Sequence, residues 1–206
     1  NKNDIKMIKV SNIKEEVVLG IDPGTNVMGY SFIIKKGGKI NILEMNVLKL
    51  NTKIEMSTRM KTILDFIIDK INDYKPDILA LEAPFYGKNV QSMLKLGRVQ
   101  GICIAAGLSK DIPFMEFEPR KVKQSITGNG ASSKEQVAKM LQRTIGFKEI
   151  PTYLDATDSL AVAVCYLNQN TLSSITNKLP KTISKSSVKK KTWTTFINEN
   201  PNRVCK

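Results

Sequence analysis

The sequence predicts an α/β fold in which a mixed five-stranded sheet is flanked by helices. Short apolar segments alternate with longer segments whose apolar residues recur at spacings of three and four, as in buried strands and amphipathic helices. Three strand-like segments precede the first helix-like one, and Gly37-Gly38 between two of them is typical of a hairpin turn. A length of 206 residues, with 41% hydrophobic and 25% charged residues, suits one ordinary domain with tails.

The spacing of apolar residues also gives the expected bounds of each strand and helix. The expected strands are residues 17–22, 27–34, 39–50, 77–82 and 113–117. The expected helices are residues 54–74, 88–108, 131–145 and 154–168. Pro76 should end the first helix, because proline cannot continue a helical hydrogen-bond pattern.

Composition narrows the function classes. The chain has no histidine, which excludes histidine-based catalytic triads and histidine-ligated zinc. An enzyme built from it would use carboxylates, lysines, hydroxyl groups or a metal. The net charge of +13 is typical of a protein that binds a polyanion, either a nucleic acid or an anionic membrane surface.

The charge is unevenly distributed and suggests three parts: a leader over residues 1–16, a folded domain over residues 17–169 and a basic tail over residues 170–206. The tail has eight basic residues and one acid, and we expect it to be disordered when free. Trp193 lies in a short apolar cluster of the tail that either docks on the domain or stacks on a base. The absence of a long apolar run and the three widely spaced cysteines lead us to expect a cytoplasmic protein without a membrane segment.

Acidic residues interrupt the apolar pattern at three places. Asp22 ends the first strand, Glu82 ends the fourth, and Asp155 and Asp158 share one face at the start of the last helix. Each alone has an ordinary explanation: a turn, a solvated strand end, or acids favoured by the helix dipole. If the sheet brings them together, four carboxylates would repel one another unless cations bind, and oxygen ligands favour Mg²⁺ or Mn²⁺. Two such ions would support phosphodiester hydrolysis without histidine.

Four segments then occur in a characteristic order. They are GIDPGTNVMGY (residues 20–30), LEAPFYGKN (81–89), PRKVKQSITGNGASSKEQV (119–137) and DATDSLAVAVCY (155–166). Over residues 17–169 the chain therefore resembles the RuvC family of Holliday junction resolvases. The resemblance implies a ribonuclease-H-like fold and a homodimer that makes paired, magnesium-dependent nicks in two strands of like polarity at four-way junctions. It also implies a role in homologous recombination and repair, with a branch-migration motor complex as a further partner.

The resemblance assigns roles to individual residues. It implies that the catalytic metal ligands are Asp22, Glu82, Asp155 and Asp158. Lys123 and Lys134 match lysines near the scissile phosphate, although unaided each would be taken for a surface lysine. Phe85 matches an aromatic residue wedged into the junction centre, in preference to a core phenylalanine. Further DNA contacts are expected from Tyr86, Lys88, Arg120 and Lys121.

The chain departs from the family pattern at one metal position and at its two ends. Some relatives carry histidine at the fourth metal position, where this chain has Asp158, and either ligand is chemically adequate. The segment over residues 88–108 contains the small residues Gly97, Gly101, Ala105 and Ala106, which permit close helix approach near the dimer interface that the resemblance implies. The leader and the tail lie outside the resemblance.

Three alternative functions remain to be distinguished. A sugar-kinase or actin-like ATPase also has a Gly-Ile-Asp-x-Gly-Thr segment after its first strand, but 206 residues leave no room for its second related domain. A non-catalytic protein could bind branched DNA through the same basic face, although it would not need all four acids. A nuclease of the same fold could act on other branched or single-stranded DNA.

Overall fold

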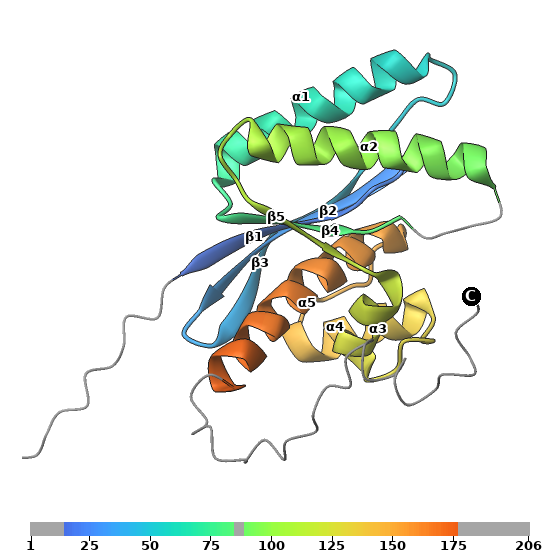
Figure 1. The fold of residues 1–206 in the computed structure, drawn as a ribbon. Coiled ribbons are helices and arrows are strands. Elements are labelled where there is room, and N and C mark those ends of the chain that lie inside the picture. Colours follow the sequence, from blue (N-terminus) through green and yellow to red (C-terminus); the bar gives the residue numbers. More distant parts are fainter. Residues whose placement is uncertain (1–14, 85–88, 177–206) are drawn as a thin grey trace, which may run out of the picture. The chain divides into compact units, whose positions relative to one another are not determined.

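One mixed sheet of five strands has the order β3-β2-β1-β4-β5. The strands are β1 (Glu16–Asp22), β2 (Val27–Lys36), β3 (Lys39–Lys49), β4 (Ile78–Glu82) and β5 (Phe114–Phe117). The first three form an antiparallel meander, whereas β4 pairs parallel with both β1 and β5. The computed structural model describes residues 15–84 and 89–176, and Figure 1 shows their arrangement.

The topology brings strand ends to one edge of the sheet. Because β1 and β4 are parallel neighbours, with Ile21 opposite Leu81, the acids that follow them emerge side by side. β3 runs antiparallel to β2, which runs antiparallel to β1, so the last residue of β3 lies at this same edge. Ligands of α/β sheets commonly bind outside the carboxyl ends of strands, so this edge is the expected site.

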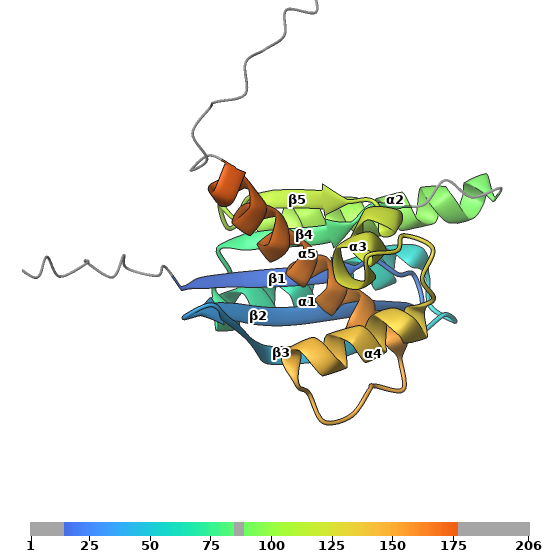
Figure 2. The same ribbon diagram turned by 90° about the horizontal axis from the view of Figure 1, so that it is seen from below.

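Helices cover both faces of the sheet (Figures 1 and 2). They are α1 (Met56–Tyr74), α2 (Val90–Leu108), α3 (Pro119–Thr127), α4 (Lys134–Ile145) and α5 (Leu154–Thr176). Side chains of β1 alternate between the faces: Leu19 and Ile21 pack against α1 and α2, and Val18 packs on the face of α5. The buried segment of α5, residues 156–167, forms the centre of that second core.

Two glycines allow α5 to lie directly against the sheet. A Cβ atom on Gly20 of β1 would come within 2.2 Å of the Ser159 carbonyl oxygen, and one on Gly29 of β2 within 1.9 Å of the Asp155 carbonyl oxygen. Only glycine fits at such backbone contacts. The first turns of α5 are therefore fixed beside the end of β1.

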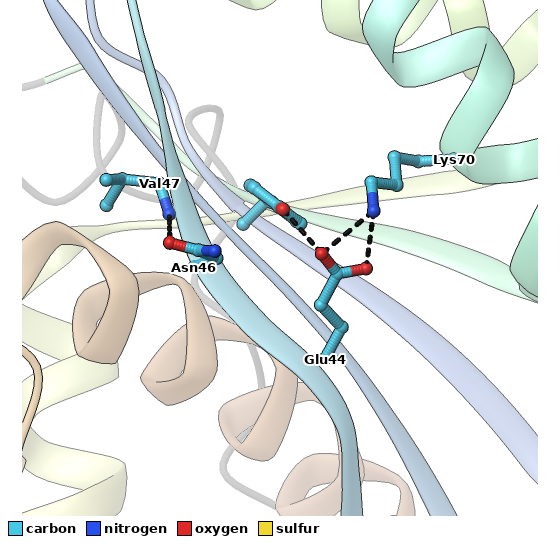
Figure 3. A network of polar contacts seen from close by, with 5 residues as sticks. Glu44, Asn46, Val47 and Lys70 are labelled. Atoms are coloured by element: carbon cyan, nitrogen blue, oxygen red, sulfur yellow. Dashed lines mark hydrogen bonds and ion pairs between the residues drawn. The ribbon is translucent and has the colours of Figure 1, made fainter. Parts of the chain in front are cut away.

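A polar network ties α1 to the meander (Figure 3). Lys70 of α1 donates to both carboxylate oxygens of Glu44 on β3 at 2.8 and 2.7 Å, and the Tyr30 hydroxyl donates to Glu44 at 2.6 Å. On the same strand, the Asn46 side chain accepts from the Val47 N–H at 2.8 Å. The network lies on the face of the sheet that α1 covers, away from α5.

The structure confirms the mixed five-stranded sheet and its flanking helices, and it corrects three helix predictions. The short helix α3 was missed, because it has nine residues and buries only Val122. α4 begins at Lys134 rather than at residue 131, since Ser133 forms a capping box with Gln136. α5 continues to Thr176, beyond the expected end at residue 168, because that end was placed where the apolar pattern of the sequence stops.

Several expectations concern the ends of the chain. Residues 15–172 belong to one compact unit. Most of the leader and Trp193 with its neighbours lie outside the described residues, so the domain boundaries at residues 17 and 169 stay predictions. Within the described part of the chain, no helix combines the length and apolar character needed to cross a bilayer. Cys103 and Cys165 are buried free thiols.

Candidate active site

Three carboxylates meet at the edge where β1 ends. Asp22, Asp155 and Asp158 each offer one oxygen, and these three atoms lie within 4.8 Å of one another. β1 supplies Asp22, whereas the first two turns of α5 supply the other two on one helix face. Asp158 is buried at 8% exposure, and Asp22 and Asp155 are half-buried. Two acids from a helix and one from a strand therefore place their oxygens at a spacing that suits the ligands of one metal ion.

Glu82 lies beside this group but is not one of the three. It ends β4, the parallel neighbour of β1, and lines a cavity together with Asp158 and Lys134. Because Ile21 pairs with Leu81, Glu82 at the end of β4 lies next to Asp22, and its negative charge raises the pKa of Asp22. The expected convergence of four acids thus takes the form of a three-acid cluster with Glu82 at its side.

Burial and mutual repulsion perturb these acids. Burial raises the pKa of Asp22 well above its usual range, and the charges of Glu82 and Asp158 raise it further. Burial, with a smaller contribution from Asp158, raises the pKa of Glu82 to about 7. Burial also raises the pKa of Asp158, although its hydrogen bond with Lys134 opposes the shift. The cluster therefore needs a positive charge to hold all of its carboxylates ionised.

The donor set fits a hard divalent cation. Every candidate ligand is a carboxylate oxygen, and such ligands suit Mg²⁺, Ca²⁺ or Mn²⁺ rather than zinc or copper. The spacing of the three oxygens is compatible with a shared ion. Asp22, Asp155 and Asp158 would hold such an ion, and Glu82 adjoins them for a second.

Lys134 provides a cation within the cluster. It is the first residue of α4, whose position is fixed by the Ser133 capping box. Its ammonium group forms an ion pair with Asp158 and lies 3.5 Å from Asp155 Oδ1. Burial opposes the charge of Lys134, but the hydrogen bond and charge of Asp158 outweigh burial and raise its pKa. The lysine stays charged at neutral pH.

The basic residues of α3 divide into two groups. Arg120 and Lys123 line the same cavity as Glu82, Asp158 and Lys134. Lys121 is described but is not among the lining residues, and its ammonium lies 5.9 Å from the Phe117 ring centroid. The structure thus brings Lys123 and Arg120 to the acids, and it does not bring Lys121 there.

The cavity extends from the acids toward α2 and has a volume of about 1220 Å³. Its apolar wall includes Val90, Met93 and Leu94 from the first turns of α2. Phe85, Tyr86 and Lys88, which the sequence predicted to contact DNA, lie outside the described residues. Glu82, Asp158, Lys123 and Lys134 therefore line an open space large enough for a nucleotide segment.

The sequence reasoning missed Arg59 of α1. Its Nη1 donates to the Thr25 carbonyl oxygen at 3.0 Å, in the loop that follows Asp22. This contact links α1 to the acid-bearing end of β1 across the edge of the sheet. The available signal was the position of this arginine, which lies three residues after Met56 and four before Ile63 and so falls on the apolar side of the predicted helix.

Comparison with known proteins agrees with this geometry. A family model described as crossover junction endodeoxyribonuclease RuvC matches residues 18–166. The curated proteins named crossover junction endodeoxyribonuclease RuvC from Cytophaga hutchinsonii and Christiangramia forsetii are 46% and 45% identical to this chain. The alignments cover 99% and 92% of the chain, and 92% and 93% of those proteins, respectively.

A solved structure gives the same result. The Thermus thermophilus RuvC in complex with a Holliday junction substrate superposes with a TM-score of 0.72 at 28% identity, covering 77% of this chain and 97% of that one. The fold is therefore ribonuclease-H-like, as the resemblance implied. By sequence and by structure, the chain belongs to the RuvC family of crossover junction endodeoxyribonucleases.

Proposed function

We propose that this protein resolves four-way Holliday junctions in homologous recombination and repair. It would nick two strands of like polarity in a paired, metal-dependent reaction. The observation that carries the proposal is the cluster of Asp22, Asp155 and Asp158 within 4.8 Å, with Lys134 beside it. The family membership and the related structure with a junction substrate support the choice of DNA.

Magnesium is the proposed cofactor, with two ions per active site and Mn²⁺ able to substitute. An all-carboxylate site that adjoins a cavity with Arg120, Lys123 and Lys134 in its lining favours these ions, because magnesium commonly joins protein carboxylates to phosphate oxygens. Bound metal would supply an activated water and stabilise the leaving oxygen of the phosphodiester. The four acids Asp22, Glu82, Asp155 and Asp158 would hold it.

The lysines would act on the phosphate itself. Lys123 and Lys134 line the cavity beside Asp158, and this supports a role in which their ammonium groups would bind oxygens of the scissile phosphate and stabilise the charge that develops there. Arg120 would bind a neighbouring phosphate in the same cavity. The wedge role of Phe85 and the DNA contacts of Tyr86, Lys88 and Lys121 stay predictions.

A homodimer would present two such sites to one junction. One face of α2 carries exposed apolar and small residues in helical spacing: Val90 at 62% exposure, Leu94 at 54%, Gly97, Gly101, Ala105 and Leu108 at 53%. A Cβ atom added at Gly97 or Gly101 would meet nothing within 4 Å, so this face is open in the single chain. We propose that two copies pack through it, since small residues let helices approach closely.

Two wider proposals rest on the same function. A DNA-processing enzyme with buried free thiols at Cys103 and Cys165 suits the reducing cytoplasm. A branch-migration motor complex is the expected protein partner, because the family resemblance implies that the two act on the same junction.

A cleavage assay tests the proposal. Four-way junctions, flaps and linear duplexes, labelled on each strand, would be incubated with the protein and Mg²⁺. We expect symmetric nicks in two like-polarity strands of the junction and none in the duplex. Cutting of flaps but not junctions would reassign the protein to a nuclease of the same fold with another substrate.

Asp22→Asn separates chemistry from binding in the same assay. The variant should lose nicking while keeping junction affinity, because lysines and arginines carry most of the electrostatic binding. Asp69→Asn, an exposed acid on α1, serves as the matched control and should cut normally. Loss of affinity together with cutting in Asp22→Asn would mean that Asp22 is structural.

A further inference from the structure

We propose that Lys49 and Tyr153 form a separate contact for the nucleic-acid backbone, on the β3 side of the acidic cluster. Lys49 would bind a phosphate, and the Tyr153 ring would hold the ammonium group in place and cover the adjoining sugar. The inference rests on the proposed function and adds a binding position to it.

The pair is formed by two segments far apart in the sequence. Lys49 is the last residue of β3, and Tyr153 lies two residues before Asp155, just ahead of α5. The Lys49 Nζ lies 4.3 Å from the centroid of the Tyr153 ring. Both side chains are exposed, Tyr153 at 39%. The ammonium and the ring thus meet at the surface.

The sheet register places this pair next to the acids. Lys49 pairs with Val27 at the start of β2. Two residues further along β2, Gly29 pairs with Asp22 and lies directly against the Asp155 main chain. The start of β2 therefore links Lys49 to Asp22 and Asp155, and the pair lies next to the acidic cluster.

The pair and the cavity lie on opposite sides of the acids. The cavity is lined by Glu82 of β4 and by residues that adjoin β5, whereas Lys49 ends β3, the outermost strand on the other side of β1. Asp22 ends β1, which lies between them in the strand order. A strand whose phosphate sits at the acids and which continues out of the cavity would meet Lys49 and Tyr153 next.

Charge and energetics favour binding over a purely structural role. Among the described residues, Lys49 is in no ion pair, so its charge is not neutralised within that part of the chain. An exposed cation–π contact is a weak source of stability, because water solvates both partners in the unfolded chain. The same arrangement presents an ammonium donor beside an aromatic surface, the combination that nucleic-acid grooves use for backbone and stacking contacts.

The test measures junction binding and its salt dependence in metal-free buffer. Lys49→Gln should weaken binding several-fold and reduce the slope of log affinity against log salt by about 1, the effect of losing one phosphate contact. Tyr153→Ala should weaken binding in the same direction, whereas Tyr153→Phe, which keeps the ring, should bind like the wild type. Thermal unfolding should be unchanged in all three, since both positions are exposed.

Lys39→Gln is the matched control. Lys39 is the exposed first residue of β3 and lies at the opposite end of this strand from Lys49. Its variant therefore carries the same charge change away from the acids. An unchanged slope in Lys49→Gln, or an equal loss in Lys39→Gln, would overturn the inference. Binding is measured without cutting, so absence of junction cleavage by the wild type would refute the proposed function and leave this result intact.

Discussion

Lys134 and Asp158 form an ion pair inside the acidic cluster, joining the first residue of α4 to the second turn of α5. The same ammonium group lies 3.5 Å from Asp155. The lysine thus contacts two of the three carboxylates that would bind a metal. A divalent ion entering the cluster would compete with it for Asp158 and free it to bind phosphate.

Replacing Lys134 tests this competition. Lys134→Gln should lower the thermal stability of the metal-free protein, because the buried acids lose their neutralising partner. It should also increase the stabilisation that Mg²⁺ or Mn²⁺ produces, since stabilisation by a bound ligand rises with the logarithm of its affinity. Differential scanning calorimetry over a metal titration measures both effects. Lys139→Gln on the exposed side of α4 should show neither, and a metal response equal to that of the wild type in Lys134→Gln would contradict the competition.

Glu82 makes the stability of the metal-free protein depend on pH. Burial raises its folded-state pKa to about 7, above the usual value for an unfolded glutamate. The folded protein then binds more protons than the unfolded chain between about pH 4.5 and 7, so stability should fall as pH rises through this window. Across this window, the titration of Glu82 should lower the free energy of unfolding by on the order of 3 kcal/mol. Urea unfolding in EDTA across the window measures the slope.

Glu82→Gln supplies the comparison for this pH effect. The variant cannot ionise, so the part of the slope due to Glu82 should disappear. Glu149→Gln, an exposed site, should keep the wild-type slope. A Glu82→Gln protein with an unchanged slope would show that the carboxyl group is not desolvated.

The Glu44 network should stabilise the fold without affecting chemistry. Glu44→Gln weakens the contacts with Lys70 and Tyr30, and hydrogen bonds to charged groups contribute about 1.5–3 kcal/mol. Although burial opposes it, the hydrogen bond from Lys70 lowers the pKa of Glu44, so its contribution is present at neutral pH and is lost as acid protonates it. Chemical unfolding at pH 7 should show the loss, with the nicking rate at low temperature unchanged. A variant as stable as the wild type at pH 7 would disprove the stabilising role.

Gly101→Leu should prevent dimer formation without disturbing the single chain. The added side chain points into open space on α2, and leucine is a better helix former than glycine by roughly 1 kcal/mol. Two α2 helices could no longer approach, so analytical ultracentrifugation should show monomers and junction cuts should lose their pairing. Asp69→Leu places the same side chain on exposed α1 and should remain dimeric. A dimeric Gly101→Leu protein would exclude this face as the interface.

The sequence alone predicted much of the site, for an identifiable reason. Asp22 and Glu82 end apolar segments, and the parallel pairing of β1 with β4 brings such ends together. Asp155 and Asp158 share a helix face, so placing one places the other. Spacing along the chain could not reveal that Glu82 lies beside the three-acid group, because that depends on the packing of α5 against the sheet.

Other features depended on contacts that no local pattern encodes. α3 was missed because its mainly polar residues bury little surface. Without this helix, the sequence could not show that Lys123 lines the cavity and Lys121 does not. The meeting of Lys49 with Tyr153 requires the register of β3 and the path of the loop before α5. The Arg59 contact joins a helix to a loop 34 residues earlier. Each is a product of tertiary packing.

Gly20 and Gly29 set how near α5 can come to β1 and β2, and two of the three clustered aspartates are carried by that helix. A methyl group at either position would push the helix outward and widen the gap that a shared ion must bridge. Residues with no side-chain chemistry thereby set the spacing of the candidate metal ligands. A random mutagenesis screen for inactive but folded variants should recover both glycines together with the aspartates.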